Sequence, residues 1–578
     1  MRRTVPGNVA ASGMALGRVR LEQAARFRID ATPLPDDEVG VEIARLERAF
    51  ALARADMAEL RQKLHGALAR EVGEFIDAHA QLLDDPELIE GLRAMIRKGH
   101  YRASAALKAQ RDRLVAVFDN MDDPYLRSRG EDVDHVIARV QSALAREASH
   151  EEKKLATRVG EILVTEGVAP GELAHLASNG ILGVISGSGS PYSHSAILAR
   201  SLHLPMLVNV EGVLEDLRDG DLALVDGMHG EVVIHPTAQD LALYRNWQRD
   251  ALRENRRLAL LAGVDSQTRD GHRLRLYANA ERPTDIERAR TLGVEGLGLY
   301  RTEFLFLAHD GLPDEDEQFA SYRDVVVGMG GLPVTIRTLD LGADKADHAG
   351  LVVASEPNPA LGTRGVRLSL RQPDVFVTQL RAILRASGYG PVRILVPMVT
   401  NAGEVVAVRR VLAECARDLR AAGHAIPDPI ELGAMVEVPA AAVNVVALLK
   451  VTDFLAIGSN DLTQYVLAVD RNNDQLGKLY RPSHPAVLRL LAWVIGSARR
   501  AGKPVSLCGE IAGDPAFAPI LVALGLEDFS MLPDRILAQR DALSRCDWGA
   551  LRRLAPRLLR ARDADEVVAL IEAANTGA

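Results

Sequence analysis

The chain has 578 residues, a formal net charge of −9, 47% hydrophobic residues and only 4% aromatic residues. At about 150 residues per domain, this length predicts three or four domains with mainly aliphatic cores. The negative charge argues against a nucleic acid or an anionic membrane as partner, so an anionic substrate has to meet locally placed arginines.

The first part of the chain combines strands with a helical segment. Residues 1–30 are typical of short strands joined by glycine turns. From residue 36 to 154 apolar residues recur at helical spacing, as in Ile43, Leu46 and Phe50. Residues 84–87, Asp-Asp-Pro-Glu, predict a helix start with an N-cap, Pro at N1 and an acid in the first turn. We expect four or five helices within 31–154 that supply structure or a docking face.

A strand pattern returns near residue 158 and predicts a small α/β domain. Its apolar runs are EILVTEG, ILGVISG, PMLVNV, DLALVDG and EVVIHP. The helical segment therefore interrupts one domain, formed by residues 1–30 and 155–236, which is tolerated where the two ends of an insertion lie close together. Residues 237–262 are charged and rich in Ala and Leu, and they predict a helical linker.

Within this domain the segment SGSGSPYSHSAILARSLHLP, residues 186–205, brings His194 to the start of a helix-like stretch. Backbone N–H groups at a helix start, with Ser193 and Ser195 beside them, suit a phosphoryl group. A neutral imidazole can attack phosphorus. A single histidine in a Gly/Ser loop is more often a simple neighbour of an N-cap, so the case for His194 depends on the rest of the chain.

Eight apolar, strand-like runs follow residue 263, separated by segments long enough for helices. The runs are LRLYAN, GLGLYR, VTIRTLD, RILVPMV, LGAMVEV, FLAIGSND, VSLCGE and FSMLP. Eight runs over this length predict a (β/α)8 barrel within 263–578. An open doubly wound sheet is the structural alternative.

Most of these runs end in polar residues, and in such a barrel the carboxyl ends of the strands carry the chemistry. These residues are Asn279, Arg301, Glu303, Arg337, Asp340, Glu437, Asn460, Asp461, Cys508 and Glu510, with Arg471 shortly after them. The arginine side chains match phosphate or carboxylate, and Asn460 can donate to the same anion. Lys345, Arg364 and Arg367 add positive charge nearby in the sequence.

Two further groups complete the candidate site. Glu437 and Asp461 offer oxygen ligands for Mg²⁺, which also accepts phosphate and carboxylate oxygens of a substrate. The thiol of Cys508, with an ordinary pKa of about 8.5, is mostly protonated at neutral pH and can donate a proton to carbon. Singly, these residues could be rim salt bridges or, for Cys508, a small buried hydrophobe. Together with His194 they predict a site for phosphoenolpyruvate, whose phosphoryl group leaves for the histidine.

The compartment is indicated by the three cysteines, Cys415, Cys508 and Cys546, which are far apart and show no CxxC spacing. This pattern excludes a cysteine zinc site and a disulfide framework, and it is typical of a reducing compartment. The chain shows no signal-peptide pattern and no uncharged stretch of membrane-spanning length. We therefore expect a cytoplasmic protein.

Long motifs of the chain resemble those of the enzyme I family of the phosphoenolpyruvate-dependent phosphotransferase system. They are GLGLYRTEFLF, TIRTLDLGADK, EPNPALGTRGVR, MVEVPAA, IGSNDLTQYVLAVDR, LCGEIAGD, SHSAILARSLHLP and AHAQLLDDPEL. The resemblance covers nearly the whole chain. It implies a swivelling phosphohistidine domain (1–30 and 155–236), a helical phosphocarrier-binding domain (31–154), and a barrel that binds phosphoenolpyruvate and forms a homodimer.

The resemblance also implies roles for single residues. His194 would be phosphorylated on Nε2, and Cys508 would donate the proton that yields pyruvate. The implied ligands of phosphoenolpyruvate and Mg²⁺ are Arg301, Arg337, Asn460, Asp461 and Arg471 for the substrate, and Glu437 and Asp461 for the metal. The phosphoryl group would pass on to a histidine phosphocarrier protein, HPr or a nitrogen-branch relative.

The chain departs from the family pattern near His194. Ser190 and Tyr192 stand where the family has Gly and Thr, and Ala169 stands where it has Thr. A hydroxyl that could orient the imidazole is missing, and Tyr192 is a candidate substitute. The alternative function is a non-catalytic regulator that binds phosphoenolpyruvate or the carrier. A phosphoenolpyruvate synthase or dikinase would need a nucleotide-grasp domain, and no segment of the sequence is expected to form one.

Overall fold

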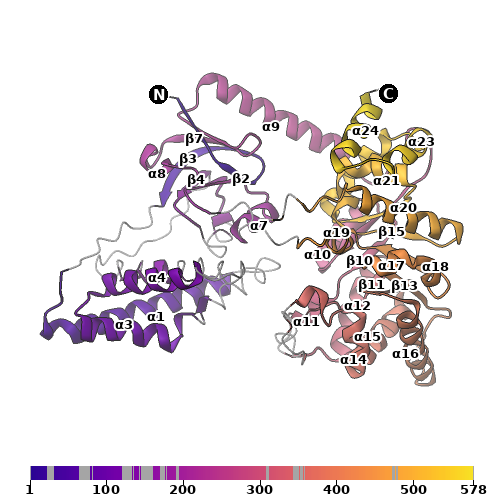
Figure 1. The fold of residues 1–578 in the computed structure, drawn as a ribbon, viewed down its shortest axis with the longest axis horizontal. Coiled ribbons are helices and arrows are strands. Elements are labelled where there is room, and N and C mark those ends of the chain that lie inside the picture. Colours follow the sequence, from indigo (N-terminus) through magenta and orange to yellow (C-terminus); the bar gives the residue numbers. More distant parts are fainter. Residues whose placement is uncertain are drawn as a thin grey trace. The chain divides into compact units, whose positions relative to one another are not determined.

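The computed structural model describes residues 2–22, 32–63, 79–80, 82–119, 133, 136–141, 143–144, 160–168, 173, 176–177, 179–189, 194–307, 311–342, 351, 356, 358–470, 476 and 479–576. The chain divides into two compact units, Met1–Ala251 and Leu252–Ala578 (Figure 1). The division falls inside α9 (Ala238–Ala259), a single helix in the segment where the composition predicted one. Each unit has hydrophobic clusters of its own.

The sheet of the first unit joins strands from both sides of the helical segment. Its strands are β1 (Arg3–Pro6), β2 (Asn8–Ala11), β3 (Met14–Glu22), β4 (Glu161–Thr165), β5 (Gly183–Ser186), β6 (Met206–Val208), β7 (Leu222–Asp226) and β8 (Glu231–Ile234). The order is β1-β8-β7-β3-β4-β5-β6-β2. β3 pairs in parallel with β4 and antiparallel with β7, so the predicted α/β fold with a helical insertion is confirmed.

Both faces of this sheet are covered, because successive side chains of a strand point to opposite sides. Ile162 and Val164 of β4 belong to one hydrophobic cluster, made largely of strand residues. Leu163, between them, belongs to a second cluster that includes Leu46 and Phe50 of the helical insertion. The insertion therefore shares a core with the sheet that it interrupts.

Three helices of the insertion are described: α1 (Val39–Lys63), α3 (Pro86–Gly99) and α4 (Ala103–Asp119). α3 begins as predicted, since Asp85 is the N-cap and its carboxylate accepts the N–H of Glu87 at 2.8 Å. Leu88, Leu92 and Ile96 form the buried stripe of this helix. The expected count of four or five helices falls partly on residues outside the described ranges.

The second unit is a closed barrel of eight parallel strands, which rules out the open-sheet alternative. The strands follow one another around the barrel in chain order: β9 (Arg275–Ala280), β10 (Leu297–Tyr300), β11 (Val334–Arg337), β12 (Val392–Val396), β13 (Glu431–Val436), β14 (Phe454–Ile457), β15 (Val505–Leu507) and β16 (Asp528–Met531). Each of the eight predicted runs supplies one strand.

Helices separate the barrel strands along the chain and pack around them (Figure 1). They are α10 (Pro283–Thr291), α11 (Glu303–Leu307), α12 (Glu315–Gly328), α14 (Val366–Arg371), α15 (Pro373–Ala386), α16 (Ala402–Ala421), α17 (Pro439–Val443), α18 (Val445–Leu448), α19 (Ser459–Leu467), α20 (Pro485–Arg500), α21 (Ala518–Leu524), α22 (Ile536–Arg545), α23 (Trp548–Leu558) and α24 (Ala564–Thr576). The first unit also contains α7 (His194–Ser201) and α8 (Val213–Asp216). Among the helices described, none is both long and apolar enough to cross a membrane.

Candidate active site

The polar residues that end the barrel strands gather at one rim, because parallel strands all direct their carboxyl ends to the same side. Arg337 is the last residue of β11, and Arg301, Glu437 and Cys508 each directly follow a strand. Asp461 does not lie at the end of a strand, where the sequence predicted it. β14 stops four residues earlier, and Asp461 lies in the first turn of α19.

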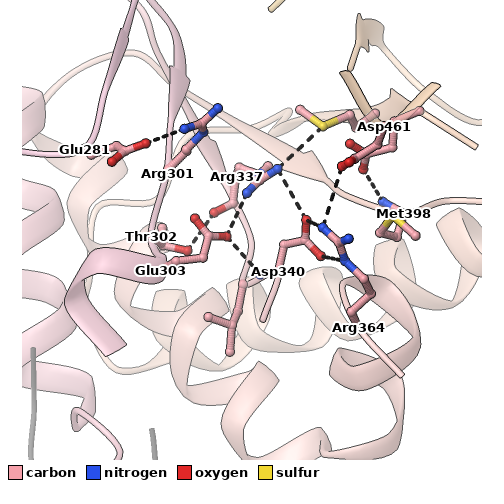
Figure 2. A network of polar contacts seen from close by, with 12 residues as sticks. Glu281, Arg301, Thr302, Glu303, Arg337, Asp340, Arg364, Met398 and Asp461 are labelled. Carbon is pink, nitrogen blue, oxygen red and sulfur yellow. Dashed lines mark hydrogen bonds and ion pairs between the residues drawn. The ribbon is translucent and has the colours of Figure 1, made fainter. Parts of the chain in front are cut away.

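Arg337 is the centre of the polar network at this rim (Figure 2). Its Nη2 donates to Glu303 Oε1 at 2.9 Å, and its Nη1 lies 3.4 Å from Asp340 Oδ2 and 3.8 Å from Met435 Sδ. Burial alone would lower the pKa of Arg337, but Glu303, Asp340 and Glu437 outweigh it and raise that pKa. The buried guanidinium therefore stays charged.

Arg364 is a second, largely buried cation, and the sequence indicated it only as a nearby positive charge. It forms a two-pronged ion pair with Asp340, with 3.0 Å between Nε and Oδ1 and 2.8 Å between Nη2 and Oδ2. Its Nη2 also lies 3.6 Å from Asp461 Oδ2. Burial would raise the pKa of Asp340, but Arg337 and Arg364 outweigh it and lower that pKa. Asp340 is thus a fixed anion between two arginines.

Arg301 lies at a more open part of the rim. Its Nη1 donates to Glu281, and its side chain is 39% exposed. An ion pair this exposed contributes little to stability. The guanidinium can therefore exchange this carboxylate for an incoming anion at small cost.

Glu437 and Asp461 follow neighbouring strands, because β13 pairs with β14. Glu437 is buried, and its Oε1 accepts the N–H of Met398 at 2.6 Å. Burial, together with the charges of Asp340 and Asp461, raises the pKa of Glu437 to about 8. Crowded carboxylates of this kind favour a divalent cation, and Mg²⁺ is often held by one or two carboxylates plus substrate oxygens.

The pair therefore fits Mg²⁺ shared with a substrate rather than a closed protein site. The described residues contain no group of three or more His, Cys, Asp or Glu side chains that could hold a metal ion.

The thiol of Cys508 is buried, and its Sγ donates to the carbonyl of Ile457 at 3.4 Å. Burial, and next the charge of Glu437, raises the pKa of Cys508 to about 12. The thiol is thus protonated at neutral pH, as a proton donor has to be. Asn279 Nδ2 donates to the carbonyl of Cys508 at 3.1 Å, and its Oδ1 accepts the hydroxyl of Ser530 at 2.6 Å. Asn279 thereby holds the backbone that carries the thiol.

Asn460 is held by Glu510. Its Nδ2 donates to Glu510 Oε1 at 3.0 Å, and its Oδ1 accepts the N–H of Glu510 at 2.9 Å. These contacts set the orientation of the amide beside the strand end that carries Cys508. Arg471, the last of the predicted substrate ligands, lies outside the described residues.

His194 is the first residue of α7, so the predicted helix start is confirmed. The N–H groups of a first helical turn have no partner within their helix. Ser195 differs from the expectation. Its hydroxyl is buried and donates to the carbonyl of Val168 at 2.6 Å, so its proton serves the neighbouring loop rather than an anion. Tyr192 and Ser193 lie outside the described residues.

Some residues that shape the rim were not predicted. Gln379 Oε1 accepts the N–H of Leu339 at 2.9 Å, and its Nε2 donates to Thr302 Oγ1 at 3.2 Å. Thr302 Oγ1 in turn donates to the carbonyl of Arg337 at 3.0 Å. Glu281 stands just past the first barrel strand, where a search of strand ends finds it. Gln379 lies inside α15, and no feature of the sequence points to it.

Family models match the chain in three successive segments. The N-terminal domain of PEP-utilising enzymes matches residues 6–129, their mobile domain matches 157–230, and their PEP-binding domain matches 255–548. A phosphoenolpyruvate-protein phosphotransferase of Cupriavidus necator is 40% identical over 570 residues, 97% of each chain. The chain belongs to the phosphoenolpyruvate-protein phosphotransferase family.

A second curated relative agrees with this family. A phosphoenolpyruvate-protein phosphotransferase of Listeria monocytogenes is 36% identical over 572 residues, 99% of each chain. A solved structure described as Enzyme I (nEIt) is 26% identical and covers 43% of this chain and 99% of its own, with a TM-score of 0.35. The predicted family and the predicted enzyme class are confirmed, whereas the roles of single residues stay predictions.

Proposed function

We propose that the chain transfers the phosphoryl group of phosphoenolpyruvate to its own His194, and then to a histidine of a small phosphocarrier protein, releasing pyruvate. The observation that carries this proposal is the barrel rim. There the largely buried arginines Arg337 and Arg364 lie beside crowded carboxylates, and a protonated, buried thiol directly follows a nearby strand. A substrate with a phosphate, a carboxylate and a carbon that needs a proton matches this combination.

The transfer consists of two displacements and one protonation. Nε2 of His194 attacks phosphorus, and the bond from phosphorus to the enol oxygen breaks with its electron pair left on oxygen. The enolate takes a proton at its methylene carbon from the thiol of Cys508, which gives pyruvate and a thiolate that regains a proton from solvent. A histidine of the carrier then attacks the phosphorus, and the bond from phosphorus to His194 breaks.

We assign the remaining groups to binding. The proposed substrate ligands are Arg301, Arg337, Asn460, Asp461 and Arg471. Mg²⁺ would be held by Glu437 and Asp461, and when bound it supplies positive charge opposite the anionic oxygens of the substrate. Arg364, paired with Asp340, keeps the carboxylate of Asp461 directed to the rim.

The carrier is proposed to be an HPr-like protein of the sugar or nitrogen branch that docks on the helical insertion. We further propose a cytoplasmic homodimer, associated through the barrel, that acts without nucleic acid or membrane. The net charge of −9 and three buried, free cysteines support this setting.

Radiolabelled phosphoenolpyruvate with Mg²⁺ tests the proposal. The wild-type chain should acquire acid-labile, base-stable label, and His194→Ala should acquire none, because it lacks the accepting nitrogen. His229→Ala is the matched control. This exposed histidine of the same unit pairs only with Asp226 among the described contacts that involve its side chain, and its loss should leave labelling unchanged.

Two outcomes would contradict the proposal. Release of pyruvate by His194→Ala at the wild-type rate would show that this histidine takes no part. Binding of phosphoenolpyruvate by the wild-type chain without any label would favour the non-catalytic regulator.

A further inference from the structure

A basic groove lies on the barrel unit at the amino ends of β14 and β15, away from the polar rim. It has a volume of about 560 Å³, and its charged lining consists of Arg409, Arg410, Lys450, Asp453 and Lys503. Four cations therefore share the groove with one carboxylate. No residue of the proposed active site contributes to it.

The single carboxylate is already engaged. Asp453 Oδ2 lies 2.9 Å from Arg409 Nη2 and accepts the N–H of Leu432 at 2.8 Å. Arg409 Nη2 also donates to the carbonyl of Val451 at 3.0 Å. These contacts hold the guanidinium of Arg409 at the edge of the barrel. The negative charge of Asp453 is thereby paired with Arg409 and does not compensate the other cations.

The other three cations are not neutralised. Lys503 Nζ donates to the carbonyl of Thr452, which provides a hydrogen bond but no opposite charge. Arg410 and Lys450 are exposed, and neither has a carboxylate within ion-pair distance in the described part of the chain. Like charges gathered in one hollow repel one another, and an anion placed between them relieves that repulsion.

The position of the groove separates it from the proposed substrate site. Asp453 directly precedes β14, whereas Asp461 follows the other end of that strand. Lys503 precedes β15, whereas Cys508 directly follows it. A strand of four residues such as β14 spans about 13 Å at 3.3 Å per residue, so a ligand of the groove does not reach the rim.

We propose that this groove binds a small polyvalent anion that carries a diphosphate-type group. The guanidinium groups of Arg409 and Arg410 match pairs of phosphate oxygens, and the ammonium groups of Lys450 and Lys503 supply point charges. The volume lies within the range of small-molecule sites. Three uncompensated positive charges match a ligand with two or three negative charges.

Inorganic pyrophosphate is the probe for this site. The full-length chain is titrated by calorimetry without Mg²⁺ at constant ionic strength, and saturable binding is expected. Arg410→Ala/Lys450→Ala should bind pyrophosphate at least roughly tenfold more weakly, because two charge-assisted contacts are lost. The control pair Arg417→Ala/Arg560→Ala removes two exposed cations outside the groove and should bind like the wild type.

A rim variant, Arg337→Met, distinguishes the groove from the proposed substrate site and should bind pyrophosphate like the wild type. Three results would overturn the inference. The first is a titration that does not saturate at about 10 mM pyrophosphate, a concentration at which even weak sites fill. The second is an equal loss of pyrophosphate affinity in the control pair, and the third is a loss of affinity confined to Arg337→Met. None of these results depends on catalysis, so they leave the proposed function to its own test.

Discussion

At the scale of single residues, the carboxylates at the rim differ in how far neighbouring arginines compensate their charge. Asp340 stays ionised because Arg337 and Arg364 both contact it. Glu437 instead has Asp340 and Asp461 as neighbours, and its pKa rises to about 8. Burial and these two like charges outweigh the attraction of Arg337, and a carboxylate in such surroundings tends to take up a proton. Glu437 is therefore the place at the rim where a divalent cation would relieve the largest imbalance.

Burial also determines the protonation state of the thiols. We therefore expect the three cysteines of the folded chain to react slowly with iodoacetamide at pH 8. Burial raises the pKa of Cys415 and Cys546 to about 11 and that of Cys508 to about 12. Alkylation requires the thiolate, whose fraction at pH 8 is then roughly 10²–10³ times lower than in a free cysteine. Mass spectrometry after timed labelling measures the rate at each site.

The sign of the pH effect follows from the raised pKa values. Labelling should accelerate about tenfold for each pH unit between pH 8 and 10, because the thiolate fraction grows in that proportion below the pKa. The chain unfolded in urea is the control and should react at ordinary cysteine rates. Rapid labelling of Cys508 in the native chain would contradict a thiol held protonated as a proton donor.

At the scale of elements, the ends of strands and helices decide which side chains reach the site. β14 ends at Ile457, and Gly458 leads directly into α19, whose first turn carries Asp461. In helix α3, too, the residues at the helix start matter. Its first residue is a proline, and the preceding Asp85 caps it.

We expect Asp85→Ala to destabilise α3 by about 1 kcal/mol, because the N–H of Glu87 loses its acceptor. Asp85→Asn retains a side-chain oxygen at the cap and serves as the matched control. Hydrogen exchange of the peptide that covers α3, followed by mass spectrometry, should be about fivefold faster in Asp85→Ala than in the wild type. Equal exchange in Asp85→Ala and Asp85→Asn would show that the cap contributes nothing.

At the scale of the whole molecule, the proposed acceptor histidine and the proposed substrate site lie in separate units. His194 lies in Met1–Ala251, whereas Arg337 and Cys508 lie in Leu252–Ala578. Each unit has its own hydrophobic clusters. A change at the rim of the barrel should therefore leave the fold around His194 intact.

This separation predicts the behaviour of Arg337→Met. Labelling of His194 by phosphoenolpyruvate should fall by at least about 10²-fold, as is typical when a charge-stabilising donor is removed from an active site. Transfer in reverse, from a phosphorylated HPr-like carrier to His194, should stay near the wild-type rate because it needs only the first unit. Label on His194 is the measurement in both directions. Loss of both reactions in Arg337→Met would contradict the separation, and His194→Ala should lose both.

The sequence by itself determined the architecture and the side of the barrel at which the polar residues of the strand ends gather. Eight apolar runs predicted eight strands, because a strand buried in a parallel barrel needs an almost continuous apolar segment. Residues such as Arg337, Glu437 and Cys508 were predicted at one rim, since parallel strands share a direction. The motifs predicted the family, although Arg471 and the segment before His194 lie outside the described residues.

Only the tertiary structure decided which polar groups are partners. Arg364 contacts Asp340 across 24 positions of sequence, Gln379 contacts Leu339 across 40, and Asn279 contacts Cys508 across 229. Periodicity indicates which face of an element is buried, but it contains no information about which distant side chain lies opposite. These partners meet only in the folded barrel, and the basic groove at its other end, formed by residues from three separate segments, arises in the same way.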